Sequence, residues 1–346
     1  MAQAVRESGW QGMAQRRGAL GALLLPLSWV YRVLLACHRL AHTSGSREVT
    51  HLPVPVMVVG NVVVGGAGKT PTTIALVEHL TRQGWRVGVV SRGHGRRSAG
   101  ITQVLSDTDP ALCGDEPRLI RQRTGVPVWV GRQRGQAGRA LLAAHPEVNL
   151  IVCDDGLQHW ALRSDVRIAV FDDRGLGNGW LLPAGLLREP WPVRTAAHAP
   201  QFMLCHTRGD AAREVPVPPG VTPFKVRRQL SRFAVDAQGS QRALADFAGA
   251  PTMALAAIAR PEVFFAMLAD AGVAPQRCLP LPDHADATVL RDAVAGWRGD
   301  VLCTEKDLVK LDKLPDGIRA WAVPLELQIE PGFFAAVDAR LATLRA

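Results

Sequence analysis

Short apolar runs alternate with loops and helix-forming segments from Pro55 onward. The first run, 56–59 (VMVV), precedes a glycine-rich loop and an expected helix over 71–82. Continuous apolar runs of this length are typical of strands buried on both faces of a parallel sheet. Further strands are expected at 87–90, 126–130, 150–153 and 168–171, and a further helix at 132–145. Strands that alternate with helices predict an α/β fold with its site at the carboxyl ends of the strands.

A proline-rich stretch over 215–220 (VPVPPG) interrupts this pattern and indicates a boundary. Beyond it the α/β pattern returns in the segments 252–259, 261–271 (an expected helix), 301–303 and 321–325. We therefore expect a main α/β domain over 49–222 and a second, smaller α/β domain over 223–346. Residues 1–48 form a separate N-terminal segment.

The loop after the first strand, 60–70 (GNVVVGGAGKT), has the composition of a phosphate-binding loop. The common pattern requires glycine where Val63 stands, and the segment resembles instead the variant G-G-x-G-K-T. The expected nucleotide-binding residues are Gly65, Gly66, Ala67, Gly68, Lys69 and Thr70. Lys69 would neutralise phosphate charge and Thr70 would offer its hydroxyl to Mg²⁺, so the loop predicts ATP and Mg²⁺ as cofactors. The alternative is a glycine turn with an incidental lysine.

Two carboxylates, Asp154 and Asp155, end the apolar run 150–153. A Walker-B element holds Mg²⁺ from this position, although Asp-Asp-Gly is also a common turn. Gln158 and His159 follow at the carboxyl end of the expected sheet, where they would contribute polar side chains to the site. The alternative is that His159 is an exposed loop histidine.

Asp115 and Glu116 begin an expected helix, where acidic residues also serve as caps. In the functional interpretation Asp115 takes a proton from an acceptor hydroxyl. Glu116 then joins Thr70, Asp154 and Asp155 as an expected Mg²⁺ ligand.

Two motifs of the second domain carry polar side chains. His284, in Pro-Asp-His, would orient a carboxylate or share its proton if the domains close, and a surface histidine is the alternative. The segment 304–307 (TEKD) follows an expected strand, and helix capping is its alternative role.

An uncharged apolar segment, 18–31, lies near the N-terminus and is flanked by arginines. A helix of fourteen residues is ~21 Å long, shorter than the ~30 Å hydrocarbon core of a bilayer. A cleaved signal peptide with a lipoprotein-like box at 34–37, a spanning helix in which Arg32 snorkels, and a core helix are alternatives. We expect an interfacial helix, because ATP is cytosolic and export would separate the loop from it.

Composition limits the class of partner. The 346 residues carry a net charge of +9 and are 47% hydrophobic, which fits a globular protein that attracts anions such as phosphorylated substrates or lipid headgroups. Tyr31 is the single tyrosine, and no basic run is interleaved with aromatic residues, so nucleic acid is not expected as a partner. Six isolated cysteines without zinc spacing indicate reduced thiols of an intracellular protein.

The ordered set of motifs resembles the tetraacyldisaccharide 4'-kinase family, the lipid A kinases of Gram-negative bacteria. The matching segments are 52–56, 60–71, 91–93, 114–117, 154–159, 181–185, 187–190, 282–284 and 304–307. The resemblance implies a P-loop NTPase parallel-sheet domain with a second α/β domain and an N-terminal membrane-associated helix. It also implies transfer of the γ-phosphoryl of ATP to the 4'-hydroxyl of tetraacyldisaccharide 1-phosphate, which forms lipid IVA.

The resemblance assigns roles to residues. Lys69 and Asp115 match catalytic positions, with His284 working beside Asp115, while Asp154 and Asp155 match the Walker-B-type pair. Independently of the resemblance, the candidate substrate residues are Arg92 and Arg188, whose guanidinium groups can bind phosphate bidentately, and Gln158 and His159. Ala67 replaces a hydroxyl residue of the family loop, and Ala285 stands where an aromatic residue is frequent in the family.

The resemblance further implies a peripheral or monotopic enzyme on the cytoplasmic face of the bacterial inner membrane. Its expected partners are the glycolipid and the membrane surface, with no obligate protein partner. A nucleotide switch that phosphorylates no second substrate is the main rival. It needs no Asp115–His284 pair, and the chain lacks the N-K-x-D segment that reads guanine.

Overall fold

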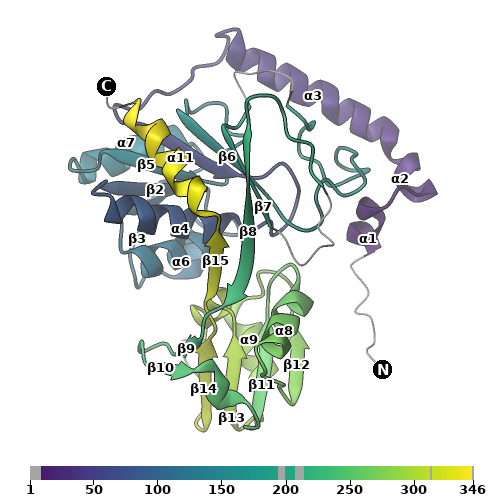
Figure 1. Ribbon diagram of the computed structural model, residues 1–346, viewed down its shortest axis with the longest axis vertical. Helices are drawn as coiled ribbons and strands as arrows, with labels where there is room; N and C mark the ends of the chain where they lie inside the picture. The colour runs from purple at the N-terminus through teal and green to yellow at the C-terminus, as the bar shows by residue number, and fades with distance from the viewer. Residues whose placement is uncertain (1–8, 194–198, 207–213, 312–313, 345–346) are drawn as a thin grey trace.

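The computed structural model describes residues 9–193, 199–206, 214–311 and 314–344. Its described part contains a nine-stranded sheet and a six-stranded sheet, which lie one above the other in Figure 1. The helices are α1 (Gly9–Gln15), α2 (Ala19–Leu23), α3 (Leu25–Thr43), α4 (Lys69–Arg82), α5 (Pro110–Cys113), α6 (Asp115–Thr124), α7 (Arg134–Ala144), η3 (Leu244–Phe247), α8 (Pro261–Asp270), α9 (Ala287–Val294), α10 (Glu305–Leu308) and α11 (Pro331–Ala342). The strands are β1 (Val56–Gly60), β2 (Val87–Ser91), β3 (Thr102–Val104), β4 (Val128–Val130), β5 (Leu150–Asp154), β6 (Val166–Phe171), β7 (Phe202–His206), β8 (Thr222–Leu230), β9 (Phe233–Val235), β10 (Gln241–Ala243), β11 (Thr252–Ala256), β12 (Arg277–Pro280), β13 (Gly299–Cys303), β14 (Ile318–Ala322) and β15 (Leu325–Ile329).

The large sheet has the order β15-β8-β7-β6-β1-β5-β2-β4-β3. Its strands are parallel except β15 and β3, which pair antiparallel at the two edges. The central strand β1 is buried throughout and pairs with β5 so that Val59 lies opposite Asp154. The loop after β1 and the Asp154–Asp155 pair therefore meet at one edge, and the expected α/β fold is confirmed.

Apolar side chains cover both faces of this sheet. On one face, Leu76 of α4, Ile120 of α6 and Phe333 of α11 pack on the strands in one core cluster. On the other face, Leu141 of α7 packs together with residues of the segment 157–193. The loop after β1 is thus anchored between two packed layers.

The second sheet has the order β10-β9-β14-β13-β11-β12, with α8 and η3 on one face and α9 on the other. As domains, the ranges 1–48, 49–222 and 223–346 stay a prediction. The sheets themselves do not divide at residue 222, because β8, β15 and α11 lie in the large sheet and its core. The strands of the six-stranded sheet, β9–β14, lie between β8 and β15 in the amino-acid sequence.

The N-terminal helices lie against the segment 178–191 at the margin of the large sheet (Figure 1). The apolar segment 18–31 is divided between α2 and α3, because Pro26 lacks an N–H and occupies the first turn of α3. Ser28 of α3 donates a hydrogen bond to the Leu181 carbonyl (2.9 Å), and the Tyr31 hydroxyl donates to the Arg188 carbonyl (2.7 Å). Within the described residues, no helix combines the length and apolar character needed to cross a bilayer.

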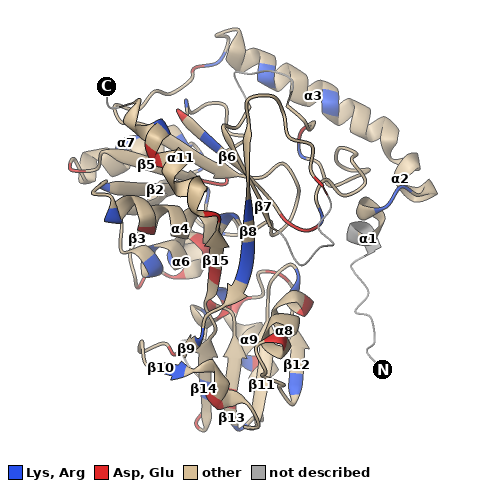
Figure 2. Ribbon diagram, in the orientation of Figure 1, with Lys and Arg blue, Asp and Glu red and all other residues tan. Residues whose placement is uncertain are grey.

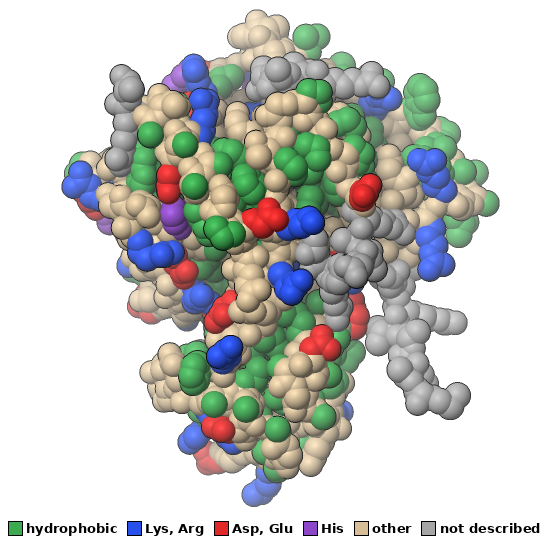
Figure 3. All heavy atoms as spheres, viewed as in Figure 1, with side chains coloured by type: hydrophobic (Ala, Val, Ile, Leu, Met, Phe, Trp, Pro, Cys, Tyr) green, Lys and Arg blue, Asp and Glu red, His purple; other side chains and the backbone are tan. Residues whose placement is uncertain are grey.

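The outer surface of α2 and α3 is apolar. Figure 3 shows hydrophobic side chains at the right-hand rim, where Figure 1 places α2 and the adjoining end of α3. The large exposed side chains there are Leu20, Leu23, Leu27, Trp29, Val30, Val33, Leu34 and Leu40. Ser28, Tyr31 and Arg39 of α3 therefore direct their polar groups toward the protein, while most of its large apolar side chains face outward.

Candidate active site

The glycine-rich loop leads directly into α4, which begins at Lys69. Gly68 has a left-handed backbone (φ +89°), and a Cβ at this position would lie 2.5 Å from Arg228 Nη2. Only glycine meets both requirements without strain. The amides of the first turn of α4 are thereby placed at the end of β1, where a helix N-terminus favours an anion.

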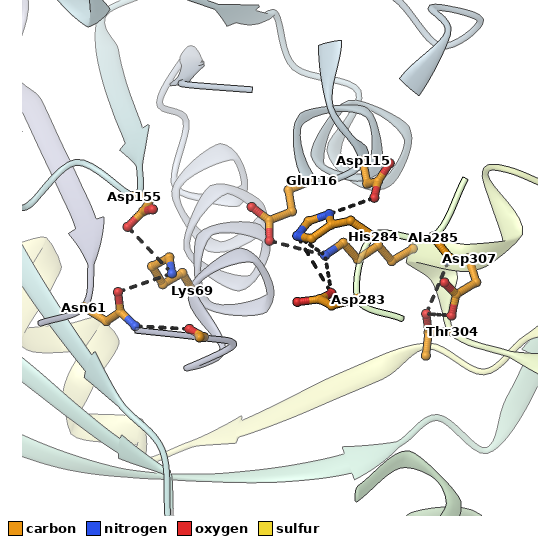
Figure 4. A network of polar contacts seen from close by, with 12 residues as sticks. Asn61, Lys69, Asp115, Glu116, Asp155, Asp283, His284, Ala285, Thr304 and Asp307 are labelled. Carbon is orange, nitrogen blue, oxygen red and sulfur yellow. Dashed lines mark hydrogen bonds and ion pairs between the residues drawn. The ribbon is translucent and has the colours of Figure 1, made fainter. Parts of the chain in front are cut away.

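Lys69 lies between the loop and the acidic pair. Its Nζ donates to Asn61 Oδ1 (3.3 Å) and lies 3.7 Å from Asp155 Oδ1 (Figure 4). The Asn61 amide nitrogen donates to the Val63 carbonyl, which fixes the direction of its oxygen. Asn61 lies in the predicted loop 60–70 without a predicted role of its own, and its place as a polar residue directly after a strand is the sequence signal for one.

Asp154 is fully buried and accepts a hydrogen bond from the Thr73 hydroxyl (2.8 Å). Burial raises the pKa of its carboxyl to about 7, and the nearby charges of Glu116 and Asp155 add to the increase. Among the described residues its Oδ2 atom has no hydrogen-bond partner. A buried carboxylate oxygen without a donor fits coordination of a cation or of water bound to one.

Asp155 has a left-handed backbone (φ +52°). Its oxygens lie 3.2 and 3.3 Å from Arg188 Nη1. Burial alone would raise the pKa of Asp155, but the cations of Lys69 and Arg188 hold it below its ordinary value. The two neighbouring carboxylates therefore differ in environment.

Asp115 is buried at the start of α6 and has two partners from the side of the second sheet. His284 Nδ1 lies 3.2 Å and Lys310 Nζ 2.7 Å from its Oδ2 atom (Figure 4 shows His284 beside it). Lys310 also donates to the Ala285 carbonyl (2.9 Å). Burial would raise the pKa of Asp115, yet hydrogen bonds from His284 and Lys310 keep it below its ordinary value. The expected pairing of Asp115 with His284 is confirmed as a contact.

Lys306 joins the two motifs of the second sheet to α6. Its Nζ lies 3.7 Å from Glu116 Oε1 and 3.4 Å from His284 Nε2. Thr304 caps α10 by accepting from the Asp307 amide, so the capping alternative for 304–307 is correct for Thr304 and Asp307. Lys306 and Lys310, on or just after that short helix, reach the site instead. Lys306 belongs to the motif 304–307, which the sequence singles out without a role for this lysine, whereas Lys310 lies outside every predicted motif.

Gln158 and His159 are both held by neighbours. The Gln158 amide donates to the Asn61 carbonyl (2.9 Å) and to Glu189 Oε1 (2.6 Å). His159 Nδ1 lies 3.3 Å from Arg134 Nη1, and Arg134 also donates to the Asp155 carbonyl (2.9 Å). Burial, followed by the charge of Arg134, lowers the pKa of His159 to about 4. His159 is therefore a neutral, half-buried ring rather than an exposed loop histidine.

The remaining candidates differ in placement. Arg188 contacts Asp155, whereas Arg92 is exposed after β2 and, within the described part of the chain, has no hydrogen bond or ion pair to the other site residues. Thr70 is buried in the first turn of α4. The described residues contain no group of three His, Cys, Asp or Glu side chains that would hold a metal ion by themselves. A cation at Thr70 and Asp154 would need further ligands, which phosphate and water supply in P-loop proteins.

A cavity of about 430 Å³ lies between α3 and the segment 179–193. Trp29, Trp180 and Trp191 line it together with the basic residues Arg32 and Arg39. Apolar walls with a few charged groups are typical of sites for amphipathic ligands. Leu187 also lines the cavity, and the next residue in the chain, Arg188, contacts Asp155.

One side of the parallel sheet thus carries the phosphate-binding loop, the Walker-B-type pair Asp154–Asp155 and the cluster formed by Asp115, His284 and Lys310. This fold and site define a P-loop kinase. The family model described as tetraacyldisaccharide-1-P 4'-kinase matches residues 20–342. The chain therefore belongs to the tetraacyldisaccharide 4'-kinase family, and it is a kinase of lipid A biosynthesis.

Relatives and a solved structure agree with this assignment. The tetraacyldisaccharide 4'-kinase of Acidovorax ebreus (strain TPSY) is 50% identical over 337 residues, covering 96% of this chain and 94% of that protein. The enzyme of the same name from Dechloromonas aromatica (strain RCB) is 42% identical over 334 residues and covers 96% of each chain. A crystal structure of LpxK from Aquifex aeolicus in complex with ATP has a TM-score of 0.76 and 25% identity, covering 93% of this chain and 99% of that one.

Proposed function

We propose that the chain binds MgATP at the loop 60–70 and that Asp115 accepts the proton of the 4'-hydroxyl as the γ-phosphoryl group is transferred. The observation that carries this proposal is the Asp115 carboxylate, which is buried at the start of α6 and is held by His284 and Lys310. A protein that only hydrolyses nucleotide or switches between states needs no such base.

The nucleotide is proposed to bind through the amides of Gly65–Thr70 and through Lys69. The ATP in the related LpxK crystal structure supports this assignment. Mg²⁺ would be held by Thr70 and Asp154, directly or through water, with Asp155 and Glu116 close by. When bound, the ion supplies charge neutralisation at the phosphates.

Asp115 is proposed as the general base because its low pKa keeps it ionised and because His284 contacts its carboxylate (Figure 4). His284 and Lys310 hold one of its oxygens, which leaves the other oxygen available for a hydroxyl group. General bases contribute about 10²–10⁴-fold in rate. His284 would share the proton or orient the carboxylate.

The glycolipid is proposed to approach from the cavity between α3 and 179–193. Arg188 would bind a phosphate or sugar group at the cavity margin, and the tryptophans would contact acyl chains. Arg92, Gln158 and His159 are further candidates for contacts with the sugar part of the glycolipid. Arg188→Ala is expected to raise the KM for the lipid strongly, and an unchanged KM would contradict this role.

The apolar outer surface of α2 and α3 is proposed to lie in the cytoplasmic interface of the inner membrane. Apolar burial together with Arg16, Arg17 and Arg32 favours an anionic bilayer surface, at about 1 kcal/mol per basic residue. A lipid substrate would then enter the cavity beside α3 directly from the membrane.

The proposal is tested by transfer of labelled γ-phosphate to tetraacyldisaccharide 1-phosphate in detergent micelles, comparing wild type with Asp115→Asn. Label in the lipid that falls at least about a hundredfold in the variant is the expected result. Hydrolysis of ATP without labelled lipid would favour the nucleotide-switch class, and an unchanged rate in the variant would exclude Asp115 as the base.

A further inference from the structure

A buried histidine and a half-buried arginine form a pair at the glycine loop, on strands that the proposed chemistry does not use. His206 is the last residue of β7 and is 4% exposed, and Arg228 lies on β8 beside it. Arg228 Nε donates to His206 Nδ1 (3.1 Å). The His206 ring therefore uses Nδ1 as an acceptor and carries its proton on Nε2. Burial, with the charge of Arg228, lowers the pKa of His206 well below its ordinary value, so the ring stays neutral.

Two donors of this pair remain unused. In the part of the chain that the structure describes, neither His206 Nε2 nor Arg228 Nη2 has a hydrogen-bond partner. Both atoms lie against Gly68, since a Cβ there would be 2.7 Å from His206 Nε2 and 2.5 Å from Arg228 Nη2. Buried donors without acceptors cost free energy in a folded protein, and a ligand that is absent from the structure is one established explanation for them.

The surroundings indicate the charge of that ligand. Two carboxylates follow β6 close to Arg228, but each is paired with another arginine, Asp172 with Arg174 at 2.8 Å and Asp173 with Arg260 at 2.6 Å. Figure 2 shows Lys and Arg along β8, the strand that carries Arg228. Arg228 therefore keeps a net positive charge beside the loop, which favours an anion with several acceptor atoms.

We propose that His206 and Arg228 bind the phosphate chain of the nucleotide, from the β7–β8 side of the loop, while Lys69 binds it from the β5 side. The proposal rests on ATP binding at the loop 60–70. The order β8-β7-β6-β1-β5 places these two groups on opposite sides of β1. The phosphates would thus supply the acceptors that the two buried donors lack.

The test is the thermal unfolding of the full chain with and without MgATP and with tripolyphosphate, which has no adenosine. His206→Asn keeps an oxygen that accepts from Arg228 Nε but removes the Nε2 donor, and Arg228→Met removes the cation. Both variants are expected to unfold near the wild-type temperature without ligand. They should lose most of the stabilisation by both ligands, with Kd for ATP raised about tenfold or more and an unchanged KM for the lipid.

A matched control is His79→Asn on α4. His79 is also a buried histidine, but its Nε2 lies 2.9 Å from Asp338 and is satisfied. This variant should unfold at a lower temperature and keep the full shift with ATP. His206→Gln, which restores a donor near the Nε2 position, should recover part of the ATP shift.

Three results would overturn the inference. Wild-type ligand shifts in His206→Asn and Arg228→Met would show that the donors do not meet phosphate. A lost ATP shift with a retained tripolyphosphate shift would place the contact on adenosine instead. A wild-type protein that ATP does not stabilise would overturn the proposed nucleotide site and this inference together, and the wild-type curve alone identifies that case.

Discussion

Asp115 and Lys310 illustrate how one ion pair joins the two sheets at the site. Asp115 begins α6 of the large sheet, and Lys310 follows α10 of the small one, with 2.7 Å between Oδ2 and Nζ. Both residues are less than a tenth exposed, so water screens the pair little. The direction of the Asp115 carboxylate therefore depends on the placement of the second sheet.

Lys310→Met is expected to lower kcat by roughly tenfold to a hundredfold, because the carboxylate loses the partner that fixes its direction. The KM for ATP should change little, and Lys310→Arg should recover part of kcat. Initial rates with saturating lipid provide the measurement. Arg123→Gln is the control, since it breaks the ion pair with Glu305 (2.6 Å) across the same contact without touching Asp115. Equal losses of kcat in both variants would show that sheet docking, and not Asp115, is what Lys310 controls.

His159 predicts a pH dependence of stability. Its pKa is about 4 in the folded protein, below the ordinary value of 6.5, so between these values the unfolded chain binds more protons. The contribution of His159 to the free energy of unfolding is fully present above about pH 6.5. It is lost as pH falls toward 4, at up to about 1.4 kcal/mol per pH unit. His159→Gln should flatten the fall in the free energy of unfolding between pH 6.5 and 4.5, measured by urea titration. A variant with the wild-type slope would assign that fall to other groups.

Sequence alone predicts those residues of the site whose local sequence context indicates their role. Lys69 and Thr70 follow a glycine loop, Asp154 ends a strand, and Asp115 stands beside His284 as expected. Lys310 cannot be predicted in this way, because its role depends on a contact between two sheets. Arg134 escapes it because an arginine in the first turn of a helix is ordinary until that turn is placed against Asp155.

Among the elements, α3 departs from the usual arrangement of a surface helix. Ser28, Tyr31 and Arg39 turn their polar groups toward the protein, with Arg39 paired to Glu189, and most of the large apolar side chains are exposed. A helix of a protein surrounded by water shows the reverse pattern. The arrangement fits a neighbouring phase that is itself apolar.

Leu27→Glu/Leu34→Glu is therefore expected to reduce binding to phosphatidylglycerol vesicles by at least about tenfold, because each leucine contributes roughly 1.5–3 kcal/mol on burial. The two leucines are 56% and 63% exposed, so folding should be unaffected. Co-sedimentation with vesicles measures the effect. Leu105→Glu/Leu112→Glu adds the same charge at exposed leucines away from α3 and should bind as wild type does. Equal losses in both double variants would show that net charge, rather than α3, determines binding.

The elements that sequence predicts well are those with continuous apolar runs, such as β1, β5 and β6. The strands β8 and β15 lack such runs and read as mixed polar segments, because each has one face or edge near solvent. Their antiparallel pairing joins residues about a hundred positions apart, as in Arg228 opposite Leu327. Such a pairing leaves no local signal, and this is why the expected boundary at 222 does not follow the sheets.

At the scale of the molecule, the chain leaves the large sheet after β8 and returns to it with β15 and α11. The two connections, 231–232 and 323–324, lie together, and the Ser231 amide donates to the Pro324 carbonyl (2.8 Å). Phe333 of α11 is fully buried against the strands of the large sheet. The core on one face of the large sheet is therefore completed by α11, which ends at Ala342.

Phe333→Ala is expected to lower the free energy of unfolding by about 3–5 kcal/mol, because it leaves a cavity in the core of the large sheet. Urea unfolding followed by circular dichroism measures the loss. Phe233→Ala is the control, since Phe233 is 48% exposed on β9 and should cost far less. Similar costs at the two positions would contradict the placement of α11 in that core.

Because the chain returns to the large sheet only after the small sheet, the two sheets are completed at different times during synthesis on the ribosome. Residues 231–324 need roughly 5–20 s to be synthesised at 5–20 residues per second. During that interval β8 has emerged without β15 as its edge partner, and the face that α11 will cover is still open. The small sheet, in contrast, has all of its strands once β14 has appeared. A nascent chain should thus carry a finished small sheet while the phosphate-binding half still exposes apolar surface, and chaperones that bind such surface would act on that half.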